Sequence, residues 1–332
     1  MEKAFVTGGS GFVGRELIRA LREKGVAVQA LARSDAAAAT VEKLGATAVR
    51  GDLSERAALA RGVAGCDTVF HAAAYVEDWG PREEFFRTNV EATRVLVEAA
   101  AKAGVATFVF IGTEACLADG KPIVRADEKR PYAKHPAGLY PLTKGMAESI
   151  VLDSARDGFR AMSVRPRLVW GLGDTSLLPK IAEAAKSGKL AWIGGGTQLT
   201  SSCHVRNLAH AALLCAERGK GGEAYFVTDG EDRPLRDFVG AILQTQGIPP
   251  TTKTVPRWLA ALVARLSESW ARVTGGHPTV NRTVVALMGV EVTVVDEKAR
   301  RELGYAPLVS VDEGLAEMAT EAAQPSLATK AR

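Results

Sequence analysis

The sequence predicts an α/β protein with a doubly wound parallel sheet and a smaller lobe toward its C-terminus. In the first half, short apolar runs alternate with longer stretches of helical periodicity, and a glycine-rich turn directly follows the first apolar run. After Trp170 the alternation loosens into glycine-rich and proline-flanked segments. Because parallel strands need crossover connections, usually helices, repeated strand–helix alternation is typical of such a sheet. With 332 residues and 47% apolar composition, the chain can bury a core of this size.

The elements follow from the apolar spacing in each segment. The first helix has apolar residues three and four positions apart, and Gly25 is placed to cap its C-terminus. The apolar runs between the helical stretches have the length of strands. In chain order, the expected strands cover residues 4–6, 26–32, 46–50, 68–71, 107–111 and 160–164, and the expected helices cover 13–24, 54–63, 88–103 and about 141–156.

Three regions are expected along the chain. Residues 1–170 should form the sheet domain, with further strands contributed from about 200–230. Residues 171–319 should form mainly the smaller lobe, and the polar residues 320–332 a flexible tail. The loop-rich lobe would supply the substrate pocket.

Composition argues against several classes of function. The 42 basic and 38 acidic residues nearly balance and are scattered, which argues against nucleic-acid binding. The four cysteines have neither the spacing nor the companion histidines of a zinc site, so we expect reduced thiols and no metal. The sequence has no signal-peptide pattern and no apolar run near the roughly 18 residues of a membrane span. We expect a cytoplasmic protein, with peripheral membrane contact left open.

The glycine-rich turn has the pattern of a dinucleotide-binding loop. It joins the first strand to the first helix, where glycines allow a tight turn and close approach of the backbone to a pyrophosphate. The helix N-terminus adds free N–H groups and a positive dipole. An ordinary turn is the alternative, and the strand–loop–helix context argues against it. The residues expected to contact the cofactor here are Gly8, Gly9, Ser10, Gly11, Phe12, Val13 and Gly14.

The end of the second strand selects between the two nicotinamide cofactors. An acidic residue there would bind the ribose 2′-hydroxyl of NAD, but the sequence has Ala32 followed by Arg33 and Ser34. Because a guanidinium matches phosphate oxygens, Arg33 and Ser34 favour NADP(H) over NAD(H). The alternative is that Arg33 is a solvated loop charge and Asp35 reaches the ribose.

The third strand ends in another candidate cofactor contact. Asp52 can accept a hydrogen bond from the adenine amino group, with Leu53 beside it. Asp52 can equally belong to the N-cap region of the following helix, and the two roles are compatible.

Tyr140 and Lys144 are the candidate catalytic pair. Four residues apart at the start of a helix, they lie on one face, and a nearby ammonium lowers the pKa of a phenol. Tyr140 could then exchange a proton with a substrate oxygen while hydride moves at carbon. The spacing alone is weak evidence, but it becomes much stronger with the glycine loop upstream.

Two further polar residues are candidates at this centre. Thr113, just after an expected strand, could present its hydroxyl to the same substrate oxygen, or serve only as a cap or turn hydroxyl. Asn89 could hold a water or a backbone carbonyl that positions Lys144, or be a plain surface cap.

With these motifs in place, the sequence resembles the extended short-chain dehydrogenase/reductases, of the NAD-dependent epimerase/dehydratase superfamily, over most of its length. Arg33 and the segments 165–174 and 303–307 look most similar to the 3β-hydroxysteroid dehydrogenase and dihydroflavonol reductase-like branch. The resemblance implies a Rossmann domain over 1–170 that binds NADP, and a Tyr–Lys–Ser/Thr centre. It also implies a homodimer through the Tyr–Lys helix. Further cofactor contacts implied by the resemblance are Ala72, Ala73, Ala74, Pro166 and Leu168.

The substrate side is predicted from a helix over residues 256–273. Its apolar stripe contains Trp258, Leu262, Leu266, Trp270 and Val273, with arginines elsewhere. Such a stripe usually packs on the core, which is the favoured interpretation. The sharper hypothesis is an apolar pocket wall or a membrane-surface element that admits a steroid, terpenoid or lipid.

The leading functional hypothesis is interconversion of a ketone and a secondary alcohol on an apolar substrate. Tyr140 would be the acid/base, Lys144 would tune it and Thr113 would orient the oxygen. A sugar-nucleotide epimerase or dehydratase with tightly bound NAD is the first alternative, and Arg33 argues against it. A cofactor-binding subunit without catalysis is the second, and the presence of both Tyr140 and Lys144 argues against it.

Overall fold

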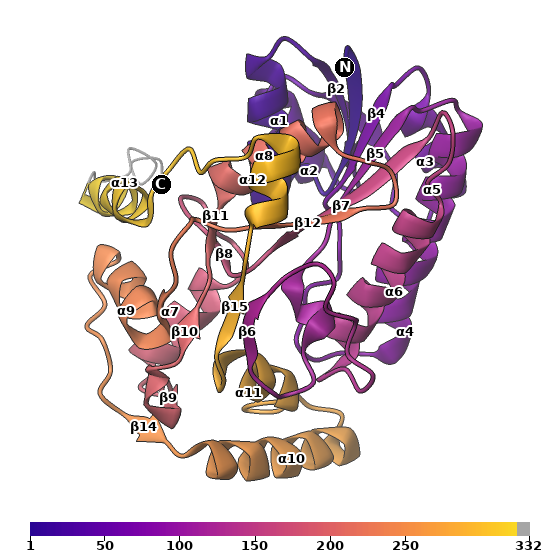
Figure 1. Ribbon diagram of the computed structural model, residues 1–332. Helices are drawn as coiled ribbons and strands as arrows, with labels where there is room; N and C mark the ends of the chain where they lie inside the picture. Colours follow the sequence, from indigo (N-terminus) through magenta and orange to yellow (C-terminus); the bar gives the residue numbers. More distant parts are fainter. Residues whose placement is uncertain (324–332) are drawn as a thin grey trace, which may run out of the picture.

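The computed structural model of the protein, described here for residues 1–323, centres on a seven-stranded parallel sheet (Figure 1). Its strand order is β12-β7-β5-β4-β1-β2-β3, so the order reverses between β1 and β4. The predicted doubly wound sheet is confirmed. Its strands are β1 (Lys3–Thr7), β2 (Ala27–Ala32), β3 (Thr47–Arg50), β4 (Thr68–His71), β5 (Thr107–Ile111), β7 (Arg160–Pro166) and β12 (Ala224–Val227).

Helices cover both faces of this sheet because each strand sends alternate side chains to opposite sides. In β1, Val6 packs with Leu17 and Leu208 on one side, whereas Phe5 packs with Leu59 and Leu96 on the other. The first side is covered by α1 (Phe12–Glu23), α2 (Asp35–Lys43), α8 (Val205–Arg218) and α12 (Glu297–Leu303); the second by α3 (Arg56–Val63), α5 (Ala92–Lys102) and α6 (Leu139–Asp153).

Two helical segments differ from the sequence expectation. Helix α2 was not predicted, because only Ala38 and Val41 of its side chains are buried and its apolar pattern is weak. The expected helix over 88–103 is the end of a longer one, in which α4 (Arg82–Phe85) leads through the π-helical η1 (Phe86–Glu91) into α5.

The lobe contains a four-stranded sheet of order β13-β10-β15-β6 and two small two-stranded sheets, β11-β8 and β14-β9. The remaining elements are β6 (Ile123–Ala126), β8 (Val169–Trp170), β9 (Trp192–Ile193), β10 (Leu199–Thr200), β11 (Cys203–His204), β13 (Arg233–Pro234), β14 (Thr254–Val255), β15 (Val292–Val294), η2 (Glu114–Leu117), η3 (Gly194–Gly196), α7 (Leu178–Lys186), α9 (Leu235–Thr245), α10 (Arg257–Thr274), α11 (Arg282–Met288) and α13 (Val311–Ala323).

The two parts of the molecule exchange segments. Strand β6 comes from the first half but pairs with β15 in the lobe, whereas β12 comes from the second half and pairs with β7 in the main sheet. Residues 320–323 of the expected flexible tail are the end of helix α13, and residues 324–332 lie outside the described residues.

Helix α10 forms as expected, but its large apolar side chains point to the surface and not toward the core. Its expected core stripe is exposed, and the helix buries Ala260, Ala264, Glu268 and Ala271 instead. The favoured interpretation, a stripe packed on the core, is therefore wrong. Alanines let the helix lie close against its neighbour α11, where tryptophan and leucine would need more space. Within residues 1–323, none of the helices is long and apolar enough to cross a membrane.

Candidate active site

The glycine loop closes tightly at the point where the strand order reverses. Gly8 has φ +72°, and a Cβ there would lie 2.7 Å from the backbone nitrogen of Ala73. A Cβ on Gly14 would overlap the carbonyl oxygen of Gly8. Only glycine fits these two positions, and the loop thereby meets the end of β4 at the place where open α/β sheets bind their ligands.

The start of α1 fits a pyrophosphate. Gly11 is the N-cap residue and makes no side-chain capping bond, so no side chain of the cap occupies the first N–H groups of the helix. The Arg15 guanidinium closes the back of the loop by donating to the carbonyls of Ser10 (3.2 Å) and Gly173 (2.6 Å). Residues 8–14 therefore have the form that a dinucleotide phosphate requires.

Of the residues that follow β2, Arg33 forms no ion pair among the described residues, whereas the side chains of Ser34 and Asp35 have partners. Arg33 is exposed, and among residues 1–323 no carboxylate forms an ion pair with it. Asp35 is paired with the Arg50 guanidinium, and Ser34 accepts a hydrogen bond from the Ala37 N–H (3.2 Å) as the N-cap of α2. The carboxylate considered for the ribose is thus held by Arg50.

Asp52 has the turn role that the sequence left open beside its cofactor role. Its Oδ1 accepts from the Ser54 N–H (2.9 Å) and the Ser54 hydroxyl (2.7 Å), and these bonds hold the pKa of Asp52 below its usual value. Leu53 is buried in the core with Leu31 and Val49.

A buried chain of hydrogen bonds ties β1 and β4 to η1. The Thr93 hydroxyl donates to the Asn89 carbonyl (2.7 Å), so it accepts from His71 Nε2 (2.9 Å), and His71 Nδ1 accepts from the Thr7 hydroxyl (2.7 Å). Burial lowers the pKa of His71 to about 3, so the ring is neutral. The chain sets the backbone of Ala73, whose N–H donates to Thr7 Oγ1 (3.3 Å).

Asn89 is buried and clamps the segment after β4 to α6. Its side chain accepts from the Tyr75 N–H (2.7 Å) and donates to the Tyr75 carbonyl (3.1 Å) and to Thr143 Oγ1 (3.0 Å). It is not a surface cap, and it contacts Thr143, one residue before Lys144, rather than a carbonyl that holds Lys144. Ala72 to Ala74 lie in the segment that this clamp fixes.

Lys144 is buried in the second turn of α6. Its ammonium donates to the Ile111 carbonyl (2.6 Å) and lies 3.9 Å from the centre of the Phe110 ring. Burial lowers the pKa of Lys144 to about 7, against the opposing charge of Glu148.

Tyr140 is partly buried, and its pKa is shifted in the direction opposite to the expectation. Burial raises the pKa of Tyr140 the most, and the charge of Glu114 raises it further. Hydrogen bonding with Thr113 lowers the pKa by a smaller amount. The expected lowering by Lys144 is therefore corrected. The Lys144 ammonium is directed at the Ile111 carbonyl, while a carboxylate acts on the phenol.

Thr113 begins η2 and has the cap role that the sequence left open. Its hydroxyl donates to Glu114 Oε2 (2.9 Å) and accepts from the Ala115 N–H (3.2 Å). The structure thus brings Thr113 and Tyr140 together, with Glu114 beside both.

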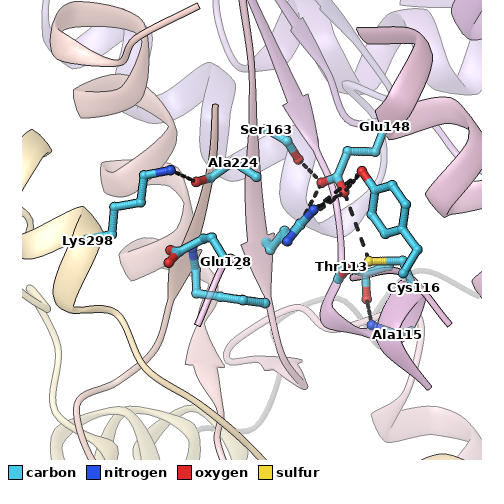
Figure 2. A network of polar contacts seen from close by, with 11 residues as sticks. Thr113, Ala115, Cys116, Glu128, Glu148, Ser163, Ala224 and Lys298 are labelled. Carbon is cyan, nitrogen blue, oxygen red and sulfur yellow. Dashed lines mark hydrogen bonds and ion pairs between the residues drawn. The ribbon is translucent and has the colours of Figure 1, made fainter. Parts of the chain in front are cut away.

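Two buried ion pairs that sequence reasoning missed support this end of the sheet. Figure 2 shows Glu148 facing Ser163 and Cys116. One Glu148 oxygen accepts from the Ser163 hydroxyl (2.5 Å), and the other accepts from Tyr132 (2.8 Å) and from Arg165 Nη2 (2.7 Å). A buried charge must be paired. Arg165, inside the otherwise apolar strand β7, could therefore have indicated from the sequence that a buried acidic partner exists.

The second pair joins η2 to the lobe. Arg167 Nη1 donates to Glu114 Oε1 (2.5 Å), and Arg167 Nη2 donates to the carbonyl of Leu287 in α11 (2.7 Å). Both charged side chains are at most 4% exposed. Of the two cofactor contacts expected in this segment, Pro166 ends β7 between the two arginines, and Leu168 has a left-handed φ of 39°.

Helix α11 also contacts the segment that precedes Tyr140. The Thr283 hydroxyl donates to the Ala137 carbonyl (3.2 Å), and a Cβ on Gly138 would overlap Thr283 Oγ1. The lobe therefore packs directly against the start of α6. Within residues 1–323, no group of three His, Cys, Asp or Glu side chains could hold a metal ion.

Comparison with known proteins places this geometry in a family. The model of the NAD dependent epimerase/dehydratase family matches residues 4–228. The chain is 45% identical to a 4-hydroxy-2-methyl-3-oxo-4-farnesyl-3,4-dihydroquinoline-1-oxide ketoreductase of Stigmatella aurantiaca, over 94% of each chain. It is 33% identical to a 2-alkyl-3-oxoalkanoate reductase of Stenotrophomonas maltophilia, over 94% of this chain and 97% of the relative. A 3-beta-hydroxysteroid dehydrogenase of Mycolicibacterium neoaurum is 32% identical, over 98% and 96%.

Solved structures agree on the fold. The crystal structure of gox2253 is 32% identical, with a TM-score of 0.77 over 97% of this chain and 99% of that one. A dTDP-glucose 4,6-dehydratase of Streptomyces venezuelae solved with NAD is 22% identical, with a TM-score of 0.75 over 96% of each chain, and shows the fold alone. The chain belongs to the NAD dependent epimerase/dehydratase family, within the extended short-chain dehydrogenase/reductases, and is an NAD(P)-dependent oxidoreductase.

Proposed function

We propose that the protein is an NADPH-dependent ketoreductase that reduces a ketone on an apolar, lipid-like substrate to a secondary alcohol. The observation that carries the proposal is the grouping of Tyr140 and Thr113 and of the buried Lys144 at the end of β5, in the same parallel sheet as β1, from which only β4 separates it. A bound nicotinamide cofactor would supply the hydride. Relatives named as a ketoreductase and a 2-alkyl-3-oxoalkanoate reductase, 45% and 33% identical, support the reaction class.

In this mechanism Tyr140 donates a proton to the carbonyl oxygen. Burial and the charge of Glu114 raise the pKa of Tyr140, so the phenol is protonated at neutral pH and can donate this proton. The direction of reduction is proposed from the relatives that are named as reductases. Thr113 would turn its hydroxyl from Glu114 toward the same oxygen and orient it. Lys144 would support the phenolate left on Tyr140 after proton transfer by turning its ammonium from the Ile111 carbonyl toward it.

The proposal of NADPH over NADH rests on Arg33. Its guanidinium is free of ion pairs among the described residues, while Asp35 is engaged by Arg50. Titration of intrinsic fluorescence with NADPH and NADH tests it on the wild type, on Arg33→Ala and on the control Arg19→Ala. We expect Arg33→Ala to weaken NADPH binding by roughly tenfold or more and to leave NADH binding unchanged. Equal or tighter binding of NADH by the wild type would overturn the cofactor proposal.

The proposal of an apolar substrate rests on the names of the relatives, which specify a farnesyl quinoline oxide, alkyl oxoalkanoates and a steroid. Consumption of NADPH with long-chain and prenylated ketones tests it. A sugar-nucleotide epimerase would instead turn over UDP-glucose without net consumption of NADPH, and that result would replace the proposal.

The homodimer through α6 and the cytoplasmic location stay predictions. Met146 on α6 is 40% exposed, so this helix keeps an accessible apolar residue. Sedimentation equilibrium of the wild type and of Met146→Glu would test the dimer.

A further inference from the structure

Helix α10 presents an exposed apolar face. Six large apolar residues on this single helix are exposed, more than on any other described element. At about 100° per residue, their positions span an arc of roughly 140° on one side of the helix. They are Trp258 (70% exposed), Leu262 (46%), Val263 (42%), Leu266 (63%), Trp270 (71%) and Val273 (84%).

The opposite face of α10 packs against α11, and the six exposed residues take no part in that packing. Ala260, Ala264 and Ala271 are buried, and Glu268 accepts from the Arg282 backbone N–H (2.7 Å) and from Arg282 Nε (2.8 Å). The large apolar side chains are therefore not needed for packing against α11. Figure 1 shows α10 at the lower edge of the molecule, remote from the main sheet.

The charges on α10 are complementary to an anionic surface. Arg257, Arg265 and Arg272 are exposed, whereas Glu268, the one acidic residue of the helix, is buried with a side chain 5% exposed. At 100° per residue, Arg265 and Arg272 lie together along one border of the apolar arc. Glu268 already pairs with Arg272 (3.0 Å), so a second copy on this face would bring the arginines of the two helices together without a further acidic residue on either helix. Anionic lipid headgroups would pair with Arg265, which forms no ion pair among the described residues, and would lie next to the exposed Arg272 on the same border.

We propose that the outer face of α10 lies in the interface of an anionic lipid bilayer, with its tryptophans and leucines among the acyl chains. An apolar face bordered by arginines is typical of helices that lie in the plane of a membrane surface. Helix α11 contacts both α10 and the segment just before Tyr140. A protein attached through α10 therefore holds the lobe beside Tyr140 at the bilayer. Its substrate is then a ketone dissolved in the membrane, a step that rests on the proposed function, whereas the binding itself does not.

Sedimentation with lipid vesicles tests the binding. The full chain is mixed with vesicles of phosphatidylglycerol and phosphatidylcholine, or of phosphatidylcholine alone, and tryptophan emission is recorded. We expect co-sedimentation and a blue shift with the anionic vesicles. The double variant Trp258→Ser/Trp270→Ser should bind them at least about tenfold more weakly, and Arg265→Glu should also lose about tenfold.

The matched control removes exposed apolar residues elsewhere. Val124→Ser/Leu308→Ser, at positions 54% and 58% exposed in other parts of the surface, should bind vesicles like the wild type. All variants should keep the thermal midpoint and the NADPH titration of the wild type, which shows that they are folded. A wild type that stays in the supernatant with both vesicle compositions at low salt overturns the proposal.

Two further outcomes would also contradict it. A lipid-free wild-type dimer that becomes a monomer in Trp258→Ser/Trp270→Ser would show that a second copy covers the face. If the double variant loses vesicle binding but reduces a vesicle-dissolved ketone as fast as the wild type, substrate access through the bilayer is excluded. A water-soluble ketone, reduced equally by both proteins, keeps this result distinct from a failure of the ketoreductase function.

Discussion

Helices α1 and α10 have the same spacing of apolar side chains but face opposite environments. In α1, Leu17, Ile18 and Leu21 are fully buried, whereas in α10 Leu266 and Trp270 are 63% and 71% exposed. The periodicity identifies a helix and its apolar stripe in both. It does not say whether the rest of the protein covers that stripe.

The residues opposite the stripe explain the difference. In α1 that side contains exposed charged residues such as Arg19 and Glu23, so only the stripe can pack on the sheet. In α10 it contains alanines and Glu268, which allow close packing and an ion pair with Arg282. A helix with small residues opposite a large apolar stripe can therefore keep the stripe free for another surface.

In the proposed function, the chemistry takes place in the half of the molecule around α1 and α6. Tyr140→Phe removes the proton donor, and we expect the rate of ketone reduction to fall by about 10²–10⁴. Cofactor binding and the melting temperature should stay near those of the wild type. An undiminished rate in steady-state measurements would remove Tyr140 from the mechanism.

Buried charge pairs should matter far more than exposed ones. Glu148→Gln leaves the Arg165 guanidinium buried without its carboxylate and should cost about 3–5 kcal/mol of unfolding free energy. The control Glu98→Gln breaks an exposed pair with Arg56 and should cost at most about 1 kcal/mol. Urea titrations measure both, and similar losses would contradict the assignment of the buried network.

The same leucine deletion should have opposite consequences in the two helices. Leu21→Ala in α1 should cost about 2–5 kcal/mol, because a buried side chain leaves a cavity. Leu266→Ala in α10 should change the unfolding free energy by no more than about 0.5 kcal/mol. If Leu266→Ala destabilised the lipid-free protein as much as Leu21→Ala, the outer face of α10 would be covered in solution.

Burial of Lys144 should make stability depend on pH. The pKa of Lys144 is lowered to about 7 from 10.5, so between these values the unfolded chain binds more protons than the folded protein. The unfolding free energy contributed by this group therefore rises with pH across that window and is least favourable below pH 7. We expect a gain of about 2 kcal/mol between pH 7 and pH 9 that is absent in Lys144→Met. Equal pH dependence of the two proteins would exclude a buried, titrating Lys144.

The sequence predicted the parts of the fold and site that depend on local patterns. Strand alternation, the glycine loop and the Tyr140–Lys144 spacing are each contained in a short segment, and the structure builds the predicted sheet around them. Helix α2 escaped prediction because alanines supply most of its apolar surface.

The features that sequence reasoning missed depend on distant partners. Glu114 and Arg167 are 53 residues apart and meet only because η2 follows β5 and β7 lies beside it. The carbonyl that accepts a hydrogen bond from Lys144 belongs to Ile111, the last residue of β5, and this contact too depends on the packing of α6 against that strand. The raised pKa of Tyr140 follows from its burial and, second, from the charge of Glu114, so its direction could not be obtained from the Tyr–Lys spacing.

The central claim is net reduction of an apolar ketone at the expense of NADPH. The direct measurement mixes the wild-type protein with NADPH and a long-chain 3-oxo compound, and follows NADPH absorbance together with formation of the alcohol. We expect one alcohol to appear for each NADPH consumed, and Tyr140→Phe to slow both equally. Turnover of a sugar nucleotide with no net loss of NADPH, and no reduction of any apolar ketone, would contradict it.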